Sequence, residues 1–125
     1  MIRDLSLDYP DFLIASSEWF AFVPAKEYFD EPGDHADELE TSVMMHYHPE
    51  LVNLDEAGDG NYKKFASQML NEKVAWIPRN WQKVSQDTGI GNPKKASAGK
   101  GKKYAEAVVA KYALLFEELV HKELY

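Results

Sequence analysis

One short apolar run, Phe12-Leu13-Ile14-Ala15, limits the folds open to this chain more than any other feature of its sequence. A continuous apolar segment of this length is typical of a β-strand that is buried on both faces. Such a strand lies in a parallel sheet, because it needs neighbouring strands on both sides and helices above and below. The run therefore predicts an α/β fold with a mostly parallel sheet.

Two helices are indicated by apolar residues that recur at helical spacing. The first is predicted over Asp34–His48, where Asp34 is a good N-cap and Pro49 ends the helix. The second is a long final helix, for which Ser97 is a plausible N-cap. Its apolar stripe consists of Tyr104, Val108, Tyr112, Leu115, Phe116 and Leu119.

The chain contains too few strands to complete the sheet that its best strand requires. Trp19–Pro24 could be extended or a short helical piece, and Val74–Ile77 could be a strand or an apolar plug under a loop. One convincing strand beside two amphipathic helices cannot form a closed α/β layer structure. We therefore interpret residues 1–125 as a single domain that is the second half of a larger α/β domain, with completion by another chain as the alternative.

The start of the first predicted helix carries two candidate functional side chains. His35 lies at the helix start, and Glu40 follows five residues later. Glu40 falls on a predicted apolar face, where a carboxylate is costly unless it is paired, hydrogen-bonded or bound to a metal. This His–Glu pair is a candidate site; the alternatives are a solvated loop histidine and a carboxylate paired with a lysine or with backbone amides. The apolar positions of this face are Ala36, Leu39, Val43, Met44 and Tyr47.

The composition argues against several classes of protein. The chain has no cysteine, so disulfides, thiol nucleophiles and thiolate metal sites are excluded. No apolar run approaches the roughly 20 residues that span a bilayer, and the N-terminus lacks a signal-peptide layout. We therefore expect a cytoplasmic protein without a membrane partner.

The charge is uneven along the chain. The net charge is −7, but five lysines within residues 94–103 leave −12 for the remainder. This acidic body argues against a nucleic-acid partner, because phosphate contacts need a broad basic face. We interpret the lysine segment as a solvated helix start, with an anion or an acidic neighbouring subunit as the alternative ligand.

Two motifs resemble those of the creatininase (creatinine amidohydrolase) family. The first is Gly33–Ser42, Gly-Asp-His-Ala-Asp-Glu-Leu-Glu-Thr-Ser, followed by Val-Met-Met and by His48–Val52, His-Pro-Glu-Leu-Val. The second is Thr88–Pro93 with Ala96–Gly101, which is similar to the glycine- and proline-containing loop before the last helix of family members. The resemblance covers nearly the whole chain, but only the C-terminal half of a typical member.

The resemblance implies a three-layer α/β/α sandwich that binds divalent zinc or manganese and hydrolyses a cyclic amide or a related C–N bond. It implies that His35 shuttles a proton between the attacking water and the leaving nitrogen. Glu40 would bind the metal or orient one of its ligands. Asp37 departs from the family, which usually has glycine there. Most metal ligands of the family lie in N-terminal segments that this chain does not contain.

Three hypotheses follow for the function. The first is a metal-dependent amidohydrolase represented by its C-terminal half and inactive as this fragment, because one histidine and one glutamate cannot make a two-metal site. The second is a truncated, non-catalytic protein that is stabilised as a homo-oligomer. The third is one half of a split enzyme whose other half is a separate polypeptide.

Overall fold

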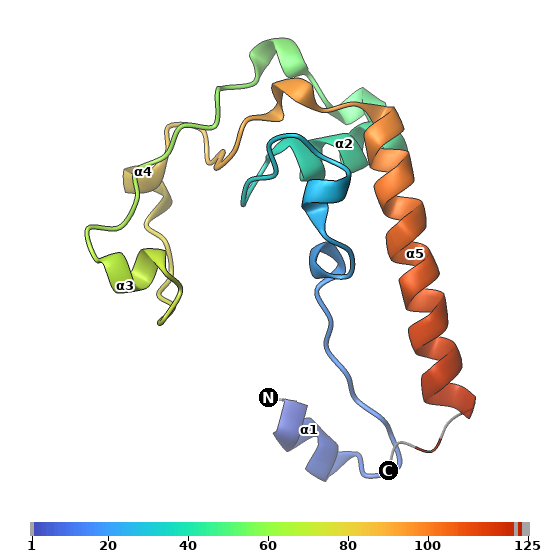
Figure 1. The fold of residues 1–125 in the computed structure, drawn as a ribbon. Coiled ribbons are helices and arrows are strands. Elements are labelled where there is room, and N and C mark those ends of the chain that lie inside the picture. Colours follow the sequence, from blue (N-terminus) through green and yellow to red (C-terminus); the bar gives the residue numbers. More distant parts are fainter. Residues whose placement is uncertain (1, 122, 124–125) are drawn as a thin grey trace.

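The computed structural model describes residues 2–121 and 123, and this part of the chain is built from helices and long loops (Figure 1). In Figure 1, α2 lies beside the first turns of α5, and two arms extend from this body. One arm is the N-terminal segment that carries α1, and the other carries α3 and α4. The α-helices are α1 (Ile2–Asp8), α2 (Glu38–Tyr47), α3 (Gln68–Asn71), α4 (Trp81–Val84) and α5 (Ala98–His121), and short 3₁₀ turns lie at Trp19–Ala21, Ala25–Glu27, Pro49–Leu51, Leu54–Glu56 and Pro93–Lys95.

The predicted parallel sheet, and with it the three-layer α/β/α sandwich, is wrong. Residues 2–121 and 123 contain no β-strand, and their β-type pairing is confined to an isolated antiparallel bridge between His35 and Ile90. Phe12 and Leu13 of the apolar run are 70% and 58% exposed. The prediction failed because a run of apolar residues indicates only that a segment is hydrophobic, whereas a buried strand also needs neighbouring strands to pair with.

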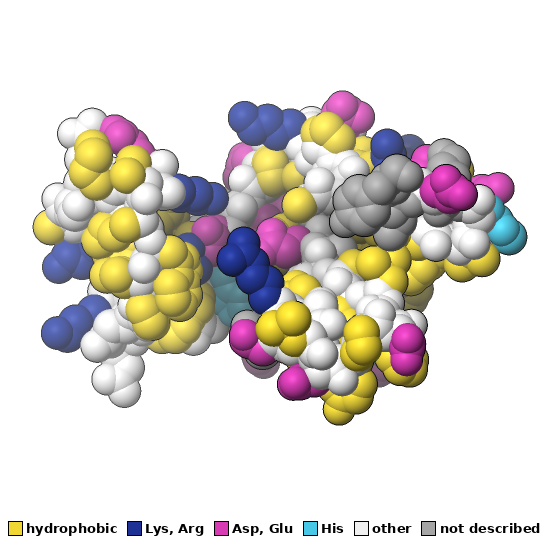
Figure 2. Space-filling model, turned by 90° about the horizontal axis from the view of Figure 1, so that it is seen from below, with side chains coloured by type: hydrophobic (Ala, Val, Ile, Leu, Met, Phe, Trp, Pro, Cys, Tyr) yellow, Lys and Arg dark blue, Asp and Glu magenta, His cyan; other side chains and the backbone are white. Residues whose placement is uncertain are grey.

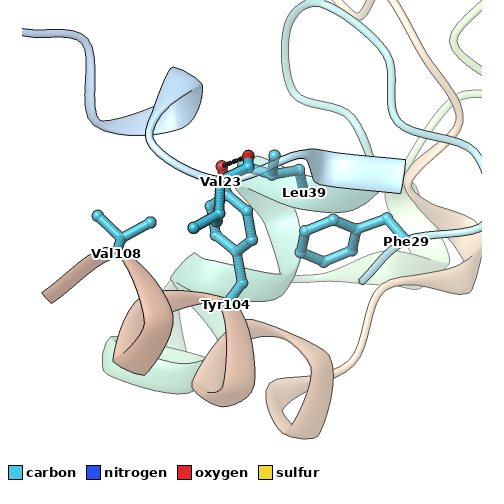
Figure 3. Packing of buried hydrophobic residues seen from close by; sticks show 5 residues of the cluster. All are labelled: Val23, Phe29, Leu39, Tyr104 and Val108. Atoms are coloured by element: carbon cyan, nitrogen blue, oxygen red, sulfur yellow. Dashed lines mark hydrogen bonds between the residues drawn. The ribbon is translucent and has the colours of Figure 1, made fainter. Parts of the chain in front are cut away.

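The core lies where α5 meets α2 and the loop that precedes it. Its buried side chains are Val23, Phe29, Leu39, Tyr104 and Val108 (Figure 3). The Tyr104 side chain is fully buried, and its hydroxyl donates a hydrogen bond to the Phe20 carbonyl oxygen at 2.9 Å. Burial in this setting raises the pKa of the Tyr104 hydroxyl. The predicted apolar stripe of the final helix is therefore confirmed as a core face in its first half.

We expect Tyr104→Phe to lower the free energy of unfolding by about 1 kcal/mol, because one intramolecular hydrogen bond is lost while the ring packing remains. Tyr112→Phe is the matched control. Its hydroxyl lies 2.8 Å from the Ser17 hydroxyl at an exposed position, so its removal should cost less than about 0.5 kcal/mol. Urea denaturation of both variants measures the difference, and equal losses would show that the buried hydrogen bond contributes no more than the exposed one.

The two main helices are in close backbone contact at Gly101. A Cβ atom built on Gly101 would lie 1.9 Å from the carbonyl oxygen of Ser42 in α2. The buried Ser42 hydroxyl also accepts a hydrogen bond from the backbone N–H of Ser97 at 3.1 Å. Ser97 itself caps α5, since its hydroxyl accepts from the backbone N–H of Lys100 at 3.3 Å, which confirms the predicted N-cap.

The N-terminus of α2 differs from the prediction. The helix begins at Glu38 rather than near Asp34, and its N-cap is Asp37, whose Oδ1 accepts from the backbone N–H of Glu40 at 2.9 Å. The other oxygen of Asp37 accepts from the N–H of Gly33 at 2.5 Å, which closes the preceding loop. Asp34 is instead held by Arg79. Among the helices within residues 2–121, none is long and apolar enough to cross a membrane.

Candidate functional site

The two sequence motifs meet at the backbone of His35. Its N–H donates to the Ile90 carbonyl at 3.1 Å, and the Ile90 N–H donates to the His35 carbonyl at 2.8 Å. Gly91 follows with a φ of +125°, and a Cβ built there would lie 2.7 Å from the Cβ of Asp37. Only glycine combines this left-handed conformation with so close an approach. The loop that precedes α5 thus fixes the position of the loop that precedes α2.

The structure brings the predicted pair His35 and Glu40 together. The Nδ1 atom of His35 lies 3.5 Å from Oε2 of Glu40, which also accepts the backbone N–H of Ala36 at 2.7 Å. The two side chains are 45% and 38% exposed, so Glu40 is not the buried carboxylate that the apolar pattern predicted. The pair is accessible to solvent, and the carboxylate of Glu40 lies next to the imidazole ring without fixing its orientation.

Glu38 has a fully buried carboxylate that the sequence patterns missed, and the neighbouring Asp37 is buried as well. The Glu38 carboxylate accepts hydrogen bonds from the ammonium group of Lys100 at 2.5 Å and from the backbone N–H of Glu31 at 2.7 Å. Lys100 also contacts Asp30 at 2.8 Å. These contacts raise the pKa of Lys100, chiefly through the hydrogen bond to Asp30 and then that to Glu38, and Lys100 in turn lowers the pKa of Asp30.

The lysine segment is therefore partly a structural feature rather than a solvated helix start. Lys100 joins the start of α5 to Glu38 in α2 and to Asp30 in the loop before α2, and Lys95 lies 2.7 Å from Glu31 in the same loop. The sequence signal for this network is the presence of both a lysine cluster and the acidic segment Asp30–Glu31, which could have been predicted to pair. The α2 face that packs inward consists of Glu38, Leu39 and Ser42, whereas Met44 and Tyr47 of the predicted apolar face are exposed.

A cleft of about 440 Å³ opens beside Glu40. Its lining combines apolar side chains, several glycines and carboxylates, and it contains no lysine or arginine. A cleft of this size and mixed lining can hold a small organic molecule. The residues that line it are Ala36, Glu40, Thr41, Met44, Leu51, Val52, Asn53, Leu54, Glu56, Ala57, Gly58, Gly60, Asp87, Gly89, Gly91 and Pro93.

His35 and Glu40 do not by themselves form a complete metal site. Within residues 2–121 and 123, no group of three or more histidine, aspartate or glutamate side chains is arranged to hold a metal ion. Protein zinc sites use at least three such ligands. His48 is exposed and lies 3.2 Å from Glu50.

The comparisons with known proteins agree with the motifs. The family model for creatininase, described as creatinine amidohydrolase, matches residues 2–116. A crystal structure of a "putative creatinine amidohydrolase" from Bacteroides fragilis NCTC 9343 is 61% identical in sequence and superposes with a TM-score of 0.91. The alignment covers 99% of this chain and 49% of that one, so the chain spans about half the length of this relative. Among curated proteins, none matches the chain.

Proposed function

We infer the function of this chain from its family: it belongs to the creatininase family, and we propose that it contributes to the hydrolysis of an amide C–N bond. Membership confirms the resemblance found in the sequence, and the relative from Bacteroides fragilis supports an amidohydrolase-like function. The observation that carries the proposal is the His35–Glu40 pair inside the motif that matches the family, in which Glu40 lines the cleft and His35 lies 3.5 Å from Glu40. The substrate we propose is a small amide, cyclic or linear.

His35 is the proposed proton carrier of this reaction. Hydrolysis adds the oxygen of water to the carbonyl carbon, moves a proton from that water to the leaving nitrogen, and breaks the C–N bond. An imidazole can both accept and donate this proton near neutral pH. Glu40, held at Oε2 by the Ala36 N–H, would place its carboxylate 3.5 Å from Nδ1 of the ring.

The divalent metal of the family needs ligands beyond this pair. We propose that the residues that complete the site come from further polypeptide, corresponding to the part of the Bacteroides fragilis relative that this chain does not match. Zinc and manganese are the candidate metals. In this proposal Glu40 contributes one ligand or orients one.

The test is amide hydrolysis by the chain mixed with the unmatched half of the Bacteroides fragilis protein, in the presence of zinc or manganese and with creatinine as the first substrate. We expect His35→Gln to lower kcat by roughly 10²–10⁴-fold, because a general acid–base group contributes about this much. His48→Gln is the matched control and should leave kcat unchanged, since His48 is exposed and pairs only with Glu50 among the described residues. Absence of metal-dependent hydrolysis of any amide by the wild-type mixture would contradict the enzymatic proposal.

A second candidate is a non-catalytic homo-oligomer, which the exposed apolar side chains favour. Figure 2 shows hydrophobic side chains gathered on the arm that carries α3 and α4, and Trp76 there is 82% exposed. Phe12 in the other arm and Phe116 on α5 are also exposed. Apolar surfaces of this kind are covered when copies associate. Light scattering that finds a stable monomer at micromolar concentration would exclude this candidate, and a one-to-one complex with the added half would favour a split enzyme.

A further inference from the structure

Trp81 is in contact with the ring of His35. The ring centroids lie 5.1 Å apart with an interplanar angle of 49°. Trp81 is the first residue of α4, a four-residue helix on the arm that also carries α3. The two residues are distant in the sequence, so the contact depends on how this arm is held against the loop before α2.

Arg79 holds the arm in this position. Its Nη1 and Nη2 atoms each lie 2.7 Å from one oxygen of Asp34, the residue that precedes His35. A bidentate arginine–carboxylate pair fixes orientation as well as distance. The guanidinium carbon also lies 5.6 Å from the centre of the Trp81 ring, within the range of a cation–π interaction. One arginine therefore links the backbone next to His35 to the indole that contacts the His35 side chain.

Apart from Trp81, the surroundings of His35 fix its backbone but leave its side-chain torsion angles free. The backbone is fixed by the paired hydrogen bonds to Ile90, and Nδ1 faces Oε2 of Glu40 at 3.5 Å. A 3.5 Å approach on one edge is too long to lock a ring that is nearly half exposed. A large flat side chain against the ring restricts the accessible rotamers.

We propose that Trp81 is a positioning residue for His35 and that the Arg79–Asp34 pair is the clamp that seats it. The proposal rests on the proposed role of His35 as the proton carrier. Trp81 is not one of the residues that pack in the core around Tyr104, and 37% of its surface is exposed. The ring contacts described for Trp81 are those with His35 and Arg79.

The first measurement is the proton NMR spectrum of the four histidine rings in the 125-residue chain, with His35 identified by His35→Gln. We expect the ring-current shift of the His35 signals to disappear in Trp81→Leu and to shrink in Arg79→Met, which removes the clamp but keeps the indole. Trp76→Leu is the matched control, because Trp76 lies on the same arm but is 82% exposed. It should leave the His35 signals in place.

Fold integrity is checked in each variant by the helical circular dichroism of α5 and by the resonances of Val108 in the core. Unchanged His35 signals in a folded Trp81→Leu variant would overturn the positioning role. A change in Trp81→Leu without any change in Arg79→Met would overturn the clamp. If Trp81→Leu loses its fold, Trp81→Phe replaces it and should show a reduced shift, whereas an unaltered shift would overturn the proposal.

The second measurement uses the reconstituted hydrolase. A positioning role predicts that Trp81→Leu lowers kcat by roughly 10–100-fold with little change in KM, because a misplaced catalytic group slows the chemical step more than it weakens binding. A fall in kcat/KM that comes from KM alone would overturn the positioning role. If the reconstituted protein has no activity, the proposed function fails, while the NMR result still decides the placement of His35.

Discussion

Gly101→Ala is expected to destabilise the chain by about 3 kcal/mol or more. The added Cβ would lie 1.9 Å from the carbonyl oxygen and 2.3 Å from the carbonyl carbon of Ser42, and both are backbone atoms. Overpacking typically costs about 1–3 kcal/mol when flexible side chains can move aside. Here α2 as a whole would have to move away from α5, which would strain the hydrogen bond between Ser42 and Ser97 and open the core around Tyr104.

Gly99→Ala is the matched control for this prediction. Gly99 lies in the first turn of the same helix, but no atom lies within 4 Å of a Cβ built there. Removal of a helical glycine at an open position should stabilise the chain by up to about 1 kcal/mol. Urea denaturation followed by circular dichroism measures both variants. If Gly101→Ala is as stable as Gly99→Ala, the close contact between α2 and α5 does not exist in solution.

Features that depend on local sequence were predictable. Ser97 caps the final helix as expected, because a serine hydroxyl and the N–H three residues later are sufficient to form the cap. The buried positions Tyr104 and Val108 follow from helical spacing. The same stripe does not predict burial at Phe116, which is 60% exposed. Helical spacing shows that a face is apolar, but it does not show whether another element packs against that face.

Features that depend on distant partners were not predictable. Asp34 and Asp37 are equally good N-caps by residue type, but Asp37 caps α2, whereas the carboxylate of Asp34 binds Arg79, 45 residues away in the sequence. Glu38 is buried and paired with Lys100 of α5, and Glu40 lies beside the cleft, although the pattern of apolar residues placed Glu40 on the buried face.

The prediction of a parallel sheet failed for a related reason. The segment that contains Phe12 and Leu13 has the composition of a buried strand, yet the residues described here place no strand beside it and leave both side chains exposed. In contrast, the candidate pair His35 and Glu40 was found from the motif, and the structure places Nδ1 and Oε2 3.5 Å apart. The clamp formed by Arg79 and Asp34 and the contact of Trp81 with His35 have no local signal, since both join segments that are distant in the sequence.

The ion pair between Lys100 and Glu38 gives the second large effect, and the two partners should not contribute equally. Lys100→Met leaves the fully buried Glu38 carboxylate with the Glu31 N–H as its one described hydrogen-bond partner. An uncompensated buried charge is strongly destabilising. Glu38→Gln removes that charge, keeps an acceptor for the Glu31 N–H, and leaves Lys100 paired with Asp30 at 2.8 Å. We therefore expect a much larger loss of stability for Lys100→Met than for Glu38→Gln.

The double variant Glu38→Gln with Lys100→Met completes a thermodynamic cycle. It should be more stable than Lys100→Met alone, because the stranded carboxylate is gone, and this sign identifies a coupled pair. Strict additivity in urea denaturation would contradict the coupling. Lys102→Met is the control, since Lys102 is exposed and lies 3.9 Å from Glu106 on the helix surface, where such pairs contribute little.

The pH dependence of the same network separates the contribution of Asp30 from that of Lys100. The lowered pKa of Asp30 means that its contribution to stability is present above the ordinary aspartate pKa and is lost as the pH falls through the lowered value. The raised pKa of Lys100 means that its contribution is present below the ordinary lysine pKa and is lost as the pH rises through the raised value. In Lys100→Met both dependences should weaken, because Lys100 is the main cause of the Asp30 shift. The free energy of unfolding is measured as a function of pH in the wild type and in Lys100→Met. If its fall at acid pH is the same in both, the acid transition arises from other carboxylates.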